Sequence, residues 1–134
     1  MKKVFSILLA GMLMAGFAVS VHAATPETAV PLWDNISTMT NVITFDDTAG
    51  SVLANISGKS GTTKITATLT VYKQTDDGWE YVDHATSVMN FSYMVFGIDF
   101  TGESGAYYKA VLDVTVTCNG TDESETKTAY KTCP

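Results

Sequence analysis

Two long stretches of this chain alternate apolar and polar side chains at every second residue. In the first stretch, residues 63–73, the apolar positions are Ile65, Ala67, Leu69 and Val71. In the second, residues 106–118, one face carries Tyr108, Ala110, Leu112, Val114, Val116 and Cys118. Successive side chains of a β-strand point to opposite faces of the sheet, so a period of two predicts strands with one buried face. We therefore expect a fold built from antiparallel sheets that cover an apolar core.

Turn sequences separate these strands from their neighbours. Asp76-Asp77-Gly78 follows the first stretch and predicts a hairpin, with a return strand over residues 79–82. Asn119-Gly120 follows the second stretch and is a favoured two-residue hairpin turn. The segment after it, residues 123–131, is polar and charged, which suits an edge strand.

Weaker strand patterns complete the chain. We expect strands over residues 36–45 and 52–57. Residues 89–100 are nearly all apolar, which predicts either a central strand or two strands with a break at Gly97. About seven short strands at this spacing are typical of a β-sandwich or a small barrel.

The N-terminal segment has the features of a signal peptide. Met1-Lys2-Lys3 is basic, the following residues up to Val21 are apolar, and Val21-His22-Ala23 is a small-residue cleavage site. The alternative is a membrane anchor, since the apolar run has roughly the minimum length to span a bilayer. Glycine and serine dilute the run, so we expect residues 1–23 to be removed. The prediction is a secreted protein with a single domain over residues 24–134.

Charge excludes several kinds of partner. The chain has 8 Lys+Arg and 14 Asp+Glu, and it contains no arginine. Lys2 and Lys3 leave with the signal peptide, so the exported part carries 6 basic and 14 acidic residues, a net charge of −8. Phosphate contacts need clustered cations. We therefore expect no nucleic-acid partner, and no membrane association after signal cleavage.

The strand spacing resembles the immunoglobulin-type sandwich. In that family a tryptophan on strand C packs in the core, and a tyrosine near the start of strand F forms the tyrosine corner. The resemblance implies that Trp79 takes the first role and Tyr108 the second. The family's inter-sheet cysteines would fall near Ala67 and Ala110, and both are alanine here. The expected fold is all-β: an immunoglobulin-like sandwich of about seven antiparallel strands after the signal peptide.

The whole chain also resembles small secreted β-sandwich proteins of Gram-positive bacteria, many from gut communities. The resemblance is carried by the signal peptide, Pro31-Leu32-Trp33, the segment Gly78-Trp79-Glu80-Tyr81-Val82, and the residues from Tyr108 through Asn119-Gly120 to Glu125-Thr126. Proteins of that kind have no assigned function. The resemblance therefore implies a fold more than an activity.

Cys118 and Cys133 are the only cysteines, and exported proteins usually pair theirs. A straight final hairpin would hold the two about 30 Å apart at 3.3 Å per residue. A disulfide needs Cα atoms within about 7 Å. Three alternatives stay open. The chain could fold back to form the bridge, Cys118 could be a buried free thiol, or an exposed Cys133 could pair with another chain.

The sequence predicts no catalytic or metal centre. His84 is the only histidine after residue 23, and the adjacent Asp83 would point to the opposite face of a strand. One histidine and two separated cysteines cannot supply a zinc site. The acidic pairs Asp46-Asp47, Asp76-Asp77 and Asp122-Glu123 could attract calcium, but none shows a full ligand spacing. Aspartate in turns mostly hydrogen-bonds its own backbone. We therefore expect a non-enzymatic protein without a cofactor.

Aromatic residues are the remaining candidates for a binding site. Trp33, Tyr72, Tyr81 and Tyr107 could form a platform on which sugar rings stack. The alternative is ordinary cross-strand aromatic packing. The favoured hypothesis is a secreted binding domain for an extracellular or cell-surface protein or glycan. The second hypothesis is a structural or assembly subunit that self-associates through a sheet edge or Cys133.

Overall fold

The computed structural model describes residues 32–134, and the expected signal peptide lies outside the described residues. This part of the chain contains seven strands and no helix that could cross a membrane. The strands are β1 (Ile36–Asp46), β2 (Ala49–Gly58), β3 (Thr62–Thr75), β4 (Gly78–Met89), β5 (Tyr93–Thr101), β6 (Tyr107–Cys118) and β7 (Thr121–Thr132).

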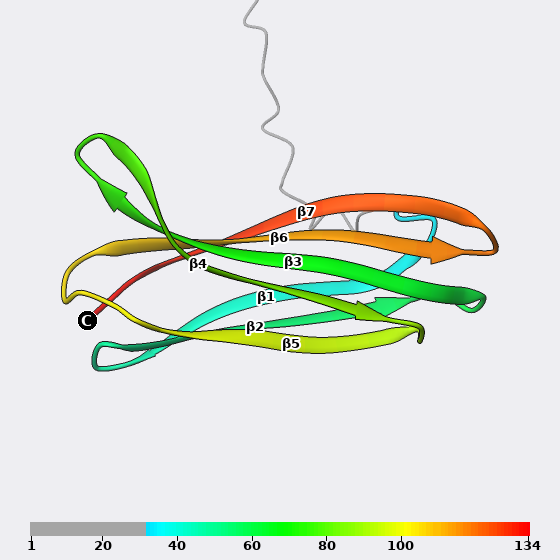
Figure 1. Cartoon of the computed structure of the whole chain (residues 1–134), viewed down its shortest axis with the longest axis horizontal. Coiled ribbons are helices and arrows are strands. Elements are labelled where there is room, and N and C mark those ends of the chain that lie inside the picture. The colour runs from blue at the N-terminus through cyan, green and yellow to red at the C-terminus, as the bar shows by residue number, and fades with distance from the viewer. Residues whose placement is uncertain (1–31) are drawn as a thin grey trace, which may run out of the picture. The chain divides into compact units, whose positions relative to one another are not determined.

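The strands form two antiparallel sheets that pack face to face (Figure 1). One sheet has three strands in the order β1-β2-β5, and the other has four in the order β4-β3-β6-β7. The expectation of an all-β sandwich of seven antiparallel strands is confirmed. The polar strand β7 lies at the edge of its sheet, as its charges predict.

The core lies between the two sheets and consists of the apolar faces that the alternation predicts. In β3 and β6 every second residue is buried, including Leu69 and Leu112, which have no exposed surface. The three-stranded sheet contributes Val52, Ala54 and Ile56 from β2, all fully buried. Each sheet therefore covers the apolar face of the other sheet and removes it from water.

The apolar segment 89–100 folds differently from the expectation. Met89 ends β4, the chain turns at residues 90–92, and β5 is an edge strand rather than a central one. Gly97 does not break it, because it pairs with Leu53 within the ladder. A Cβ atom at Gly97 would lie 2.4 Å from the carbonyl oxygen of Val52, so glycine here permits a close backbone approach.

A β-bulge in β4 changes the phase of its side chains. Val71 pairs with Asp83 but Tyr72 pairs with Tyr81, which leaves Val82 without a partner in β3. Val82 and Ala85 both pack against the core although they are three residues apart. The extra residue reverses the direction in which the preceding side chains point. Tyr81, before the bulge, therefore lies on the same outer face of the sheet as His84, after the bulge.

Polar side chains fasten β1 to the four-stranded sheet, across a seam that has no backbone ladder. The side-chain amide of Asn41 donates to the carbonyl oxygens of Ala110 at 2.8 Å and Lys127 at 3.2 Å. The Glu123 carboxylate accepts the backbone N–H groups of residues 34–36. These contacts satisfy backbone groups at the start of β1 that would otherwise lack partners.

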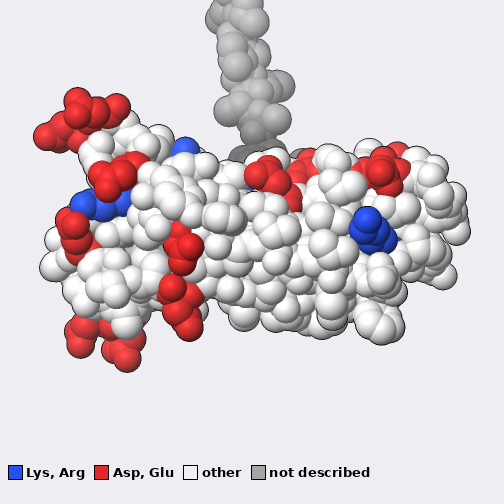
Figure 2. Space-filling model, viewed as in Figure 1, with Lys and Arg blue, Asp and Glu red and all other residues white. Residues whose placement is uncertain are grey.

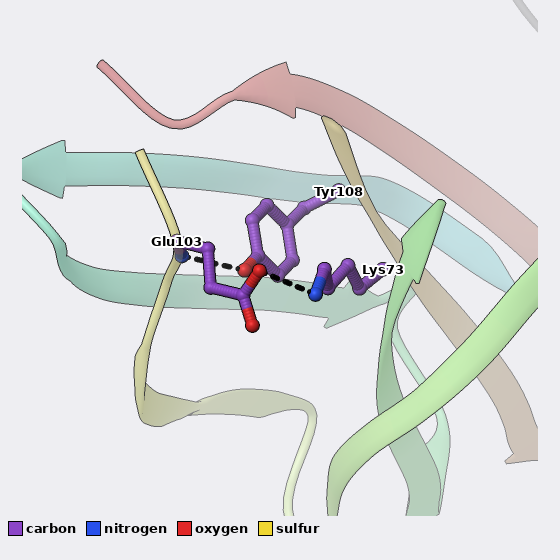
Figure 3. A network of polar contacts seen from close by, with 3 residues as sticks. All are labelled: Lys73, Glu103 and Tyr108. Atoms are coloured by element: carbon purple, nitrogen blue, oxygen red, sulfur yellow. Dashed lines mark hydrogen bonds and ion pairs between the residues drawn. The ribbon is translucent and has the colours of Figure 1, made fainter. Parts of the chain in front are cut away.

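Tyr108 closes one end of the sandwich (Figure 3). Its buried ring lies 5.2 Å from that of Phe100 and 5.6 Å from that of Phe45, centroid to centroid. The hydroxyl accepts the backbone N–H of Glu103 at 2.8 Å, and the Glu103 carboxylate pairs with the Lys73 ammonium at 2.6 Å. This ion pair raises the pKa of Lys73 above its ordinary value of 10.5. The Tyr108 hydroxyl thus ties the start of β6 to backbone five residues upstream.

Candidate ligand-binding face

Five aromatic side chains gather at one end of the outer face of the four-stranded sheet. We call them the aromatic face, and its members are Tyr72 from β3, Trp79 and Tyr81 from β4, Tyr107 from β6 and Tyr130 from β7. The strand register brings them together. Tyr72 pairs with Tyr81 on one side and Lys109 on the other, and Lys109 pairs with Tyr130.

Lys109 lies among these rings. Its ammonium is 4.4 Å from the centre of the Trp79 ring and 5.1 Å from that of Tyr72, within the range of cation–π attraction. Tyr107 and Tyr130 stack on each other, with centroids 5.8 Å apart and planes 14° apart. Trp79 lies 6.0 and 6.2 Å from these two rings. These five side chains therefore form one connected surface, and the strand register places Tyr81 beside Tyr72 at its edge.

The aromatic face stays open to solvent even though its rings pack on one another. Tyr81 and Tyr130 are each 54% exposed, Trp79 is 38% exposed and Tyr107 is 37% exposed. Aromatic side chains that gather on a protein surface and stay exposed are typical of interaction sites. The aromatic face is thus the strongest candidate for a binding site in residues 32–134.

A groove lined with hydroxyl groups continues the same outer face along the strands. We call it the hydroxyl groove, and it is lined by Thr66, Ala67, Thr68, Asp113, Val114, Thr115, Ser124, Glu125 and Thr126. Thr126 donates to the Asp113 carboxylate at 2.6 Å. The hydroxyls of Thr115 and Ser124 are 2.8 Å apart. One row of paired residues, which includes Val111, separates the groove from the aromatic face.

The structure places three of the four predicted platform residues together. Tyr72, Tyr81 and Tyr107 belong to the aromatic face. Trp33 does not, because it is partly buried against the core, near the start of β1 at the other end of the domain. Its carbonyl oxygen accepts a hydrogen bond from the ammonium of Lys59.

Trp79 is not a core residue, contrary to the expectation. It stands at the start of the edge strand β4, directly after the β3–β4 turn and beyond the bulge (Figure 1). At this position its side chain packs on the outer tyrosines instead. The positions expected for the family's inter-sheet cysteines, Ala67 and Ala110, also do not fit. They lie on β3 and β6, which are neighbours in one sheet, so they could not carry an inter-sheet disulfide.

Trp79 and Tyr130 are the two members of the aromatic face that the sequence pattern does not predict there. Tyr130 lies in a segment whose charges indicate a polar edge strand. The signal was present in the hairpin register. A two-residue Asn119-Gly120 turn pairs Cys118 with Thr121, which places Tyr130 opposite Lys109. Asn119 and Gly120 both have positive φ values, as this turn type requires.

His84 belongs to the surroundings of the aromatic face. Its Nδ1 atom lies 2.5 Å from the Tyr81 hydroxyl, a contact that the bulge permits. The Asp83 carboxylate accepts the backbone N–H of His84 rather than an imidazole proton, so it does not orient the ring. The two residues therefore do not form the base and orienter of a catalytic triad.

The acidic pairs are used in different ways. Asp122 accepts a hydrogen bond from the Thr117 hydroxyl at 2.5 Å, and Glu123 accepts backbone N–H groups at the start of β1. Asp47 has a φ of 51° in the β1–β2 turn. Within residues 32–134 no three carboxylate, imidazole or thiol groups cluster closely enough to hold a metal ion.

Both cysteines are free and buried. Cys118 is 6% exposed and Cys133 is 1% exposed. Cys118 lies beside the β6–β7 turn, whereas Cys133 follows the far end of β7, where Thr132 pairs with Tyr107. The straight hairpin keeps the sulfur atoms apart, so the candidate disulfide does not form. Of the three alternatives, the buried free thiol at Cys118 is confirmed. The alternative of an exposed Cys133 is wrong, because the packing around Gly102 covers its sulfur.

Carboxylates gather at the end of the domain that carries the β3–β4 turn, as Figure 2 shows. The aromatic face lies toward this end of the four-stranded sheet. No protein-family model matches the chain, and a search of curated proteins finds no significant match. The geometry of the aromatic face and the hydroxyl groove therefore carries the functional conclusion.

Proposed function

We propose that this protein is a secreted, non-enzymatic binding domain that acts at or beyond the cell surface. Its partner is an extracellular or cell-surface protein or glycan. The observation that carries the proposal is the aromatic face. It gathers five rings from four strands, two of which contact the Lys109 ammonium and four of which are exposed. The N-terminal signal sequence supports export of the domain to the place where such a partner would be found.

We also propose that the sandwich is immunoglobulin-like. If β3 is strand C and β4 is strand C′, the two sheets have the orders A-B-E and C′-C-F-G. Tyr108 then stands at the start of strand F, and its hydroxyl accepts a backbone N–H five residues upstream. Both features support the assignment. The chain has no strand D in this assignment, and sandwiches of this architecture do not all share one exact topology.

Aromatic packing within the sheet accounts for only part of the aromatic face. Each ring pair contributes about 0.5–1.5 kcal/mol to stability beyond its buried area. That gain requires contact between rings, but it does not require Tyr81 and Tyr130 to leave half of their surface in water. Exposed aromatic side chains with few rotatable bonds are well suited to binding, because ordering them on association costs little conformational entropy.

The test is binding of the mature protein to an array of glycans and extracellular proteins. The variant Trp79→Ala/Tyr130→Ala removes two members of the aromatic face. Phe91→Ala is the matched control, since Phe91 is also exposed, at 68%, but lies in the turn between β4 and β5, at the other end of β4 from Trp79. Loss of binding in the double variant alone supports the proposal. Equal binding by both variants, or binding by neither the wild type nor the control, refutes it.

A second candidate function is self-association through the three-stranded sheet. Its outer face carries Val42 and Leu53 as a directly paired couple, with Tyr93 and Val95 on β5. These side chains are 45–54% exposed. In Figure 2 a stretch without charged residues occupies the lower right of the view, where Figure 1 places β2 and the first part of β5. The occupant would be a second copy of the chain.

Sedimentation velocity over a range of protein concentrations tests this second candidate. Self-association through the sheet predicts a dimer that Leu53→Glu abolishes, because the substitution buries a charge in an apolar contact. A dimer that persists in Leu53→Glu, or a monomer at every concentration, would exclude this interface. Linkage through Cys133 is not proposed, since its sulfur is buried.

A further inference from the structure

The aromatic face and the hydroxyl groove lie on one outer surface and differ in chemistry. The aromatic face offers ring surfaces and a single ammonium, that of Lys109. The hydroxyl groove offers hydroxyl groups and the Asp113 carboxylate. Lys109 and Asp113 lie on the same face of β6 and are four residues apart, which is about 13 Å at 3.3 Å per residue. A ligand that touches both regions is therefore longer than one sugar ring.

We propose that the ligand is a neutral oligosaccharide that lies along the strands, from the aromatic face into the hydroxyl groove. This inference rests on the proposed binding function and specifies its ligand. A sugar presents weakly apolar C–H faces, which stack on aromatic rings, and hydroxyl groups, which donate and accept hydrogen bonds.

The polar groups of the groove have the capacity to bind sugar hydroxyls. Asp113 accepts one hydrogen bond from Thr126, and a carboxylate has acceptor sites for several more. The hydroxyls of Thr115 and Ser124 bond to each other, and each oxygen has two lone pairs as well as its proton. Lys109 adds ammonium protons at the aromatic end. The groove end of the ligand's path thus offers donors and acceptors, and the aromatic end offers the Lys109 ammonium as a donor.

Charge favours a neutral ligand over an acidic one. The exported chain has a net charge of −8, and Asp76, Asp77 and Glu80 are exposed beside the aromatic face. The groove itself contains the Asp113 carboxylate. A polyanion would meet repulsion along most of this surface, with Lys109 as the single compensating cation on the aromatic face. A polyol meets no such cost.

Tryptophan fluorescence provides a direct assay. The described domain has two tryptophans, and Trp33 lies away from the candidate site, so Trp33→Phe leaves Trp79 as the reporter. This variant is titrated with cello-, manno-, xylo- and galacto-oligosaccharides, from the monosaccharide to the hexasaccharide. We expect a saturable change in Trp79 emission for at least one series. Affinity should rise with chain length and stay constant as salt is added.

Two further variants, both built on Trp33→Phe, locate the ligand. Tyr130→Ala should weaken binding of every active oligosaccharide at least tenfold. Asp113→Asn keeps the shape of the groove but removes its charge. It should weaken the longer oligosaccharides and leave the shortest active one unchanged. Phe91→Ala, in the turn between β4 and β5, should change nothing, and circular dichroism melts confirm that each variant is folded.

The outcomes separate this inference from the proposed function. Binding confined to acidic oligosaccharides, such as oligogalacturonates, with an affinity that falls as salt rises, overturns the neutral ligand. The aromatic face then remains a glycan site. No response of Trp79 to any oligosaccharide also overturns the inference. If the array still shows a protein partner, and Trp79→Ala/Tyr130→Ala abolishes binding of that partner, the proposed function stands without the oligosaccharide inference. Equal weakening of short and long ligands by Asp113→Asn overturns the extended path.

Discussion

Removing the hydroxyl of Tyr108 isolates a single hydrogen bond at one end of the sandwich. Tyr108→Phe keeps the ring, which packs against Phe45 and Phe100, so no cavity forms. The substitution removes only the acceptor of the Glu103 N–H, which is 2.8 Å away (Figure 3). Tyr108 itself is 1% exposed. Water can therefore replace the lost partner only in part.

The expected loss of stability follows from these contacts. An intramolecular hydrogen bond contributes about 0.5–1.5 kcal/mol net, and an unsatisfied buried donor costs about 1–3 kcal/mol. Glu103 has an exposed side chain, so water recovers some of that cost. We therefore expect Tyr108→Phe to lower the free energy of unfolding by about 1–2 kcal/mol. For a domain of this size each kcal/mol lowers Tm by about 4–8 °C.

Urea and thermal denaturation, followed by circular dichroism, measure this loss. Tyr107→Phe is the matched control, because its ring is on the outer face and 37% exposed. The control should change the free energy of unfolding by less than about 0.5 kcal/mol. If Tyr108→Phe and Tyr107→Phe unfold at the same urea concentration, the hydroxyl contact does not stabilise the end of the sandwich, and the reasoning fails.

Four more substitutions or treatments probe the rest of the domain. Asn41→Asp should cost at least about 2 kcal/mol in urea unfolding, and more at pH 7 than at pH 4, because only the ionised carboxylate is repelled by the carbonyls that the amide now contacts. Gly97→Ala should cost about 1–3 kcal/mol in thermal melts, since its Cβ would press on a backbone oxygen of β2. Cys118 and Cys133 should react with a thiol reagent only after denaturation, and an intact mass two hydrogens lighter than the reduced form would contradict their free state. The pKa of Lys73 is raised in the folded state, so its ion pair stabilises at neutral pH. The Tm difference between Lys73→Met and wild type should disappear as pH rises past that pKa, above 10.5, and a difference unchanged by pH would exclude the ion pair as its cause.

Local rules were sufficient for most strands. The alternation in β3 and β6 and the Asn119-Gly120 turn each depend on residues that are neighbours in the sequence. The same rules placed Tyr72 and Tyr107 on an outer face. They were insufficient at β4, because the bulge at Val82 shifts the phase of the strand by one residue. No local pattern in the sequence marks that shift.

Patterns of neighbouring residues could not predict the contacts between segments that are distant in the sequence. Glu123 was a candidate calcium ligand by sequence, but in the folded chain its carboxylate binds backbone groups at the start of β1, almost ninety residues earlier. Nothing in the sequence distinguishes Asn41 from the other polar residues of β1, yet it joins β1 to two strands of the other sheet. These partners depend on which strands become neighbours, and strand order is a property of the whole chain.

The candidate site shows the same division. By itself, the sequence determined that the chain forms strands, where most of them lie, and which side chains of the regular strands point outward, because a period of two is a property of each strand alone. Only the tertiary structure decided that Trp79 leaves the core and that Tyr130 joins the other rings around Lys109. Strand pairing sets that arrangement, since register across four strands brings together side chains that are far apart in the sequence.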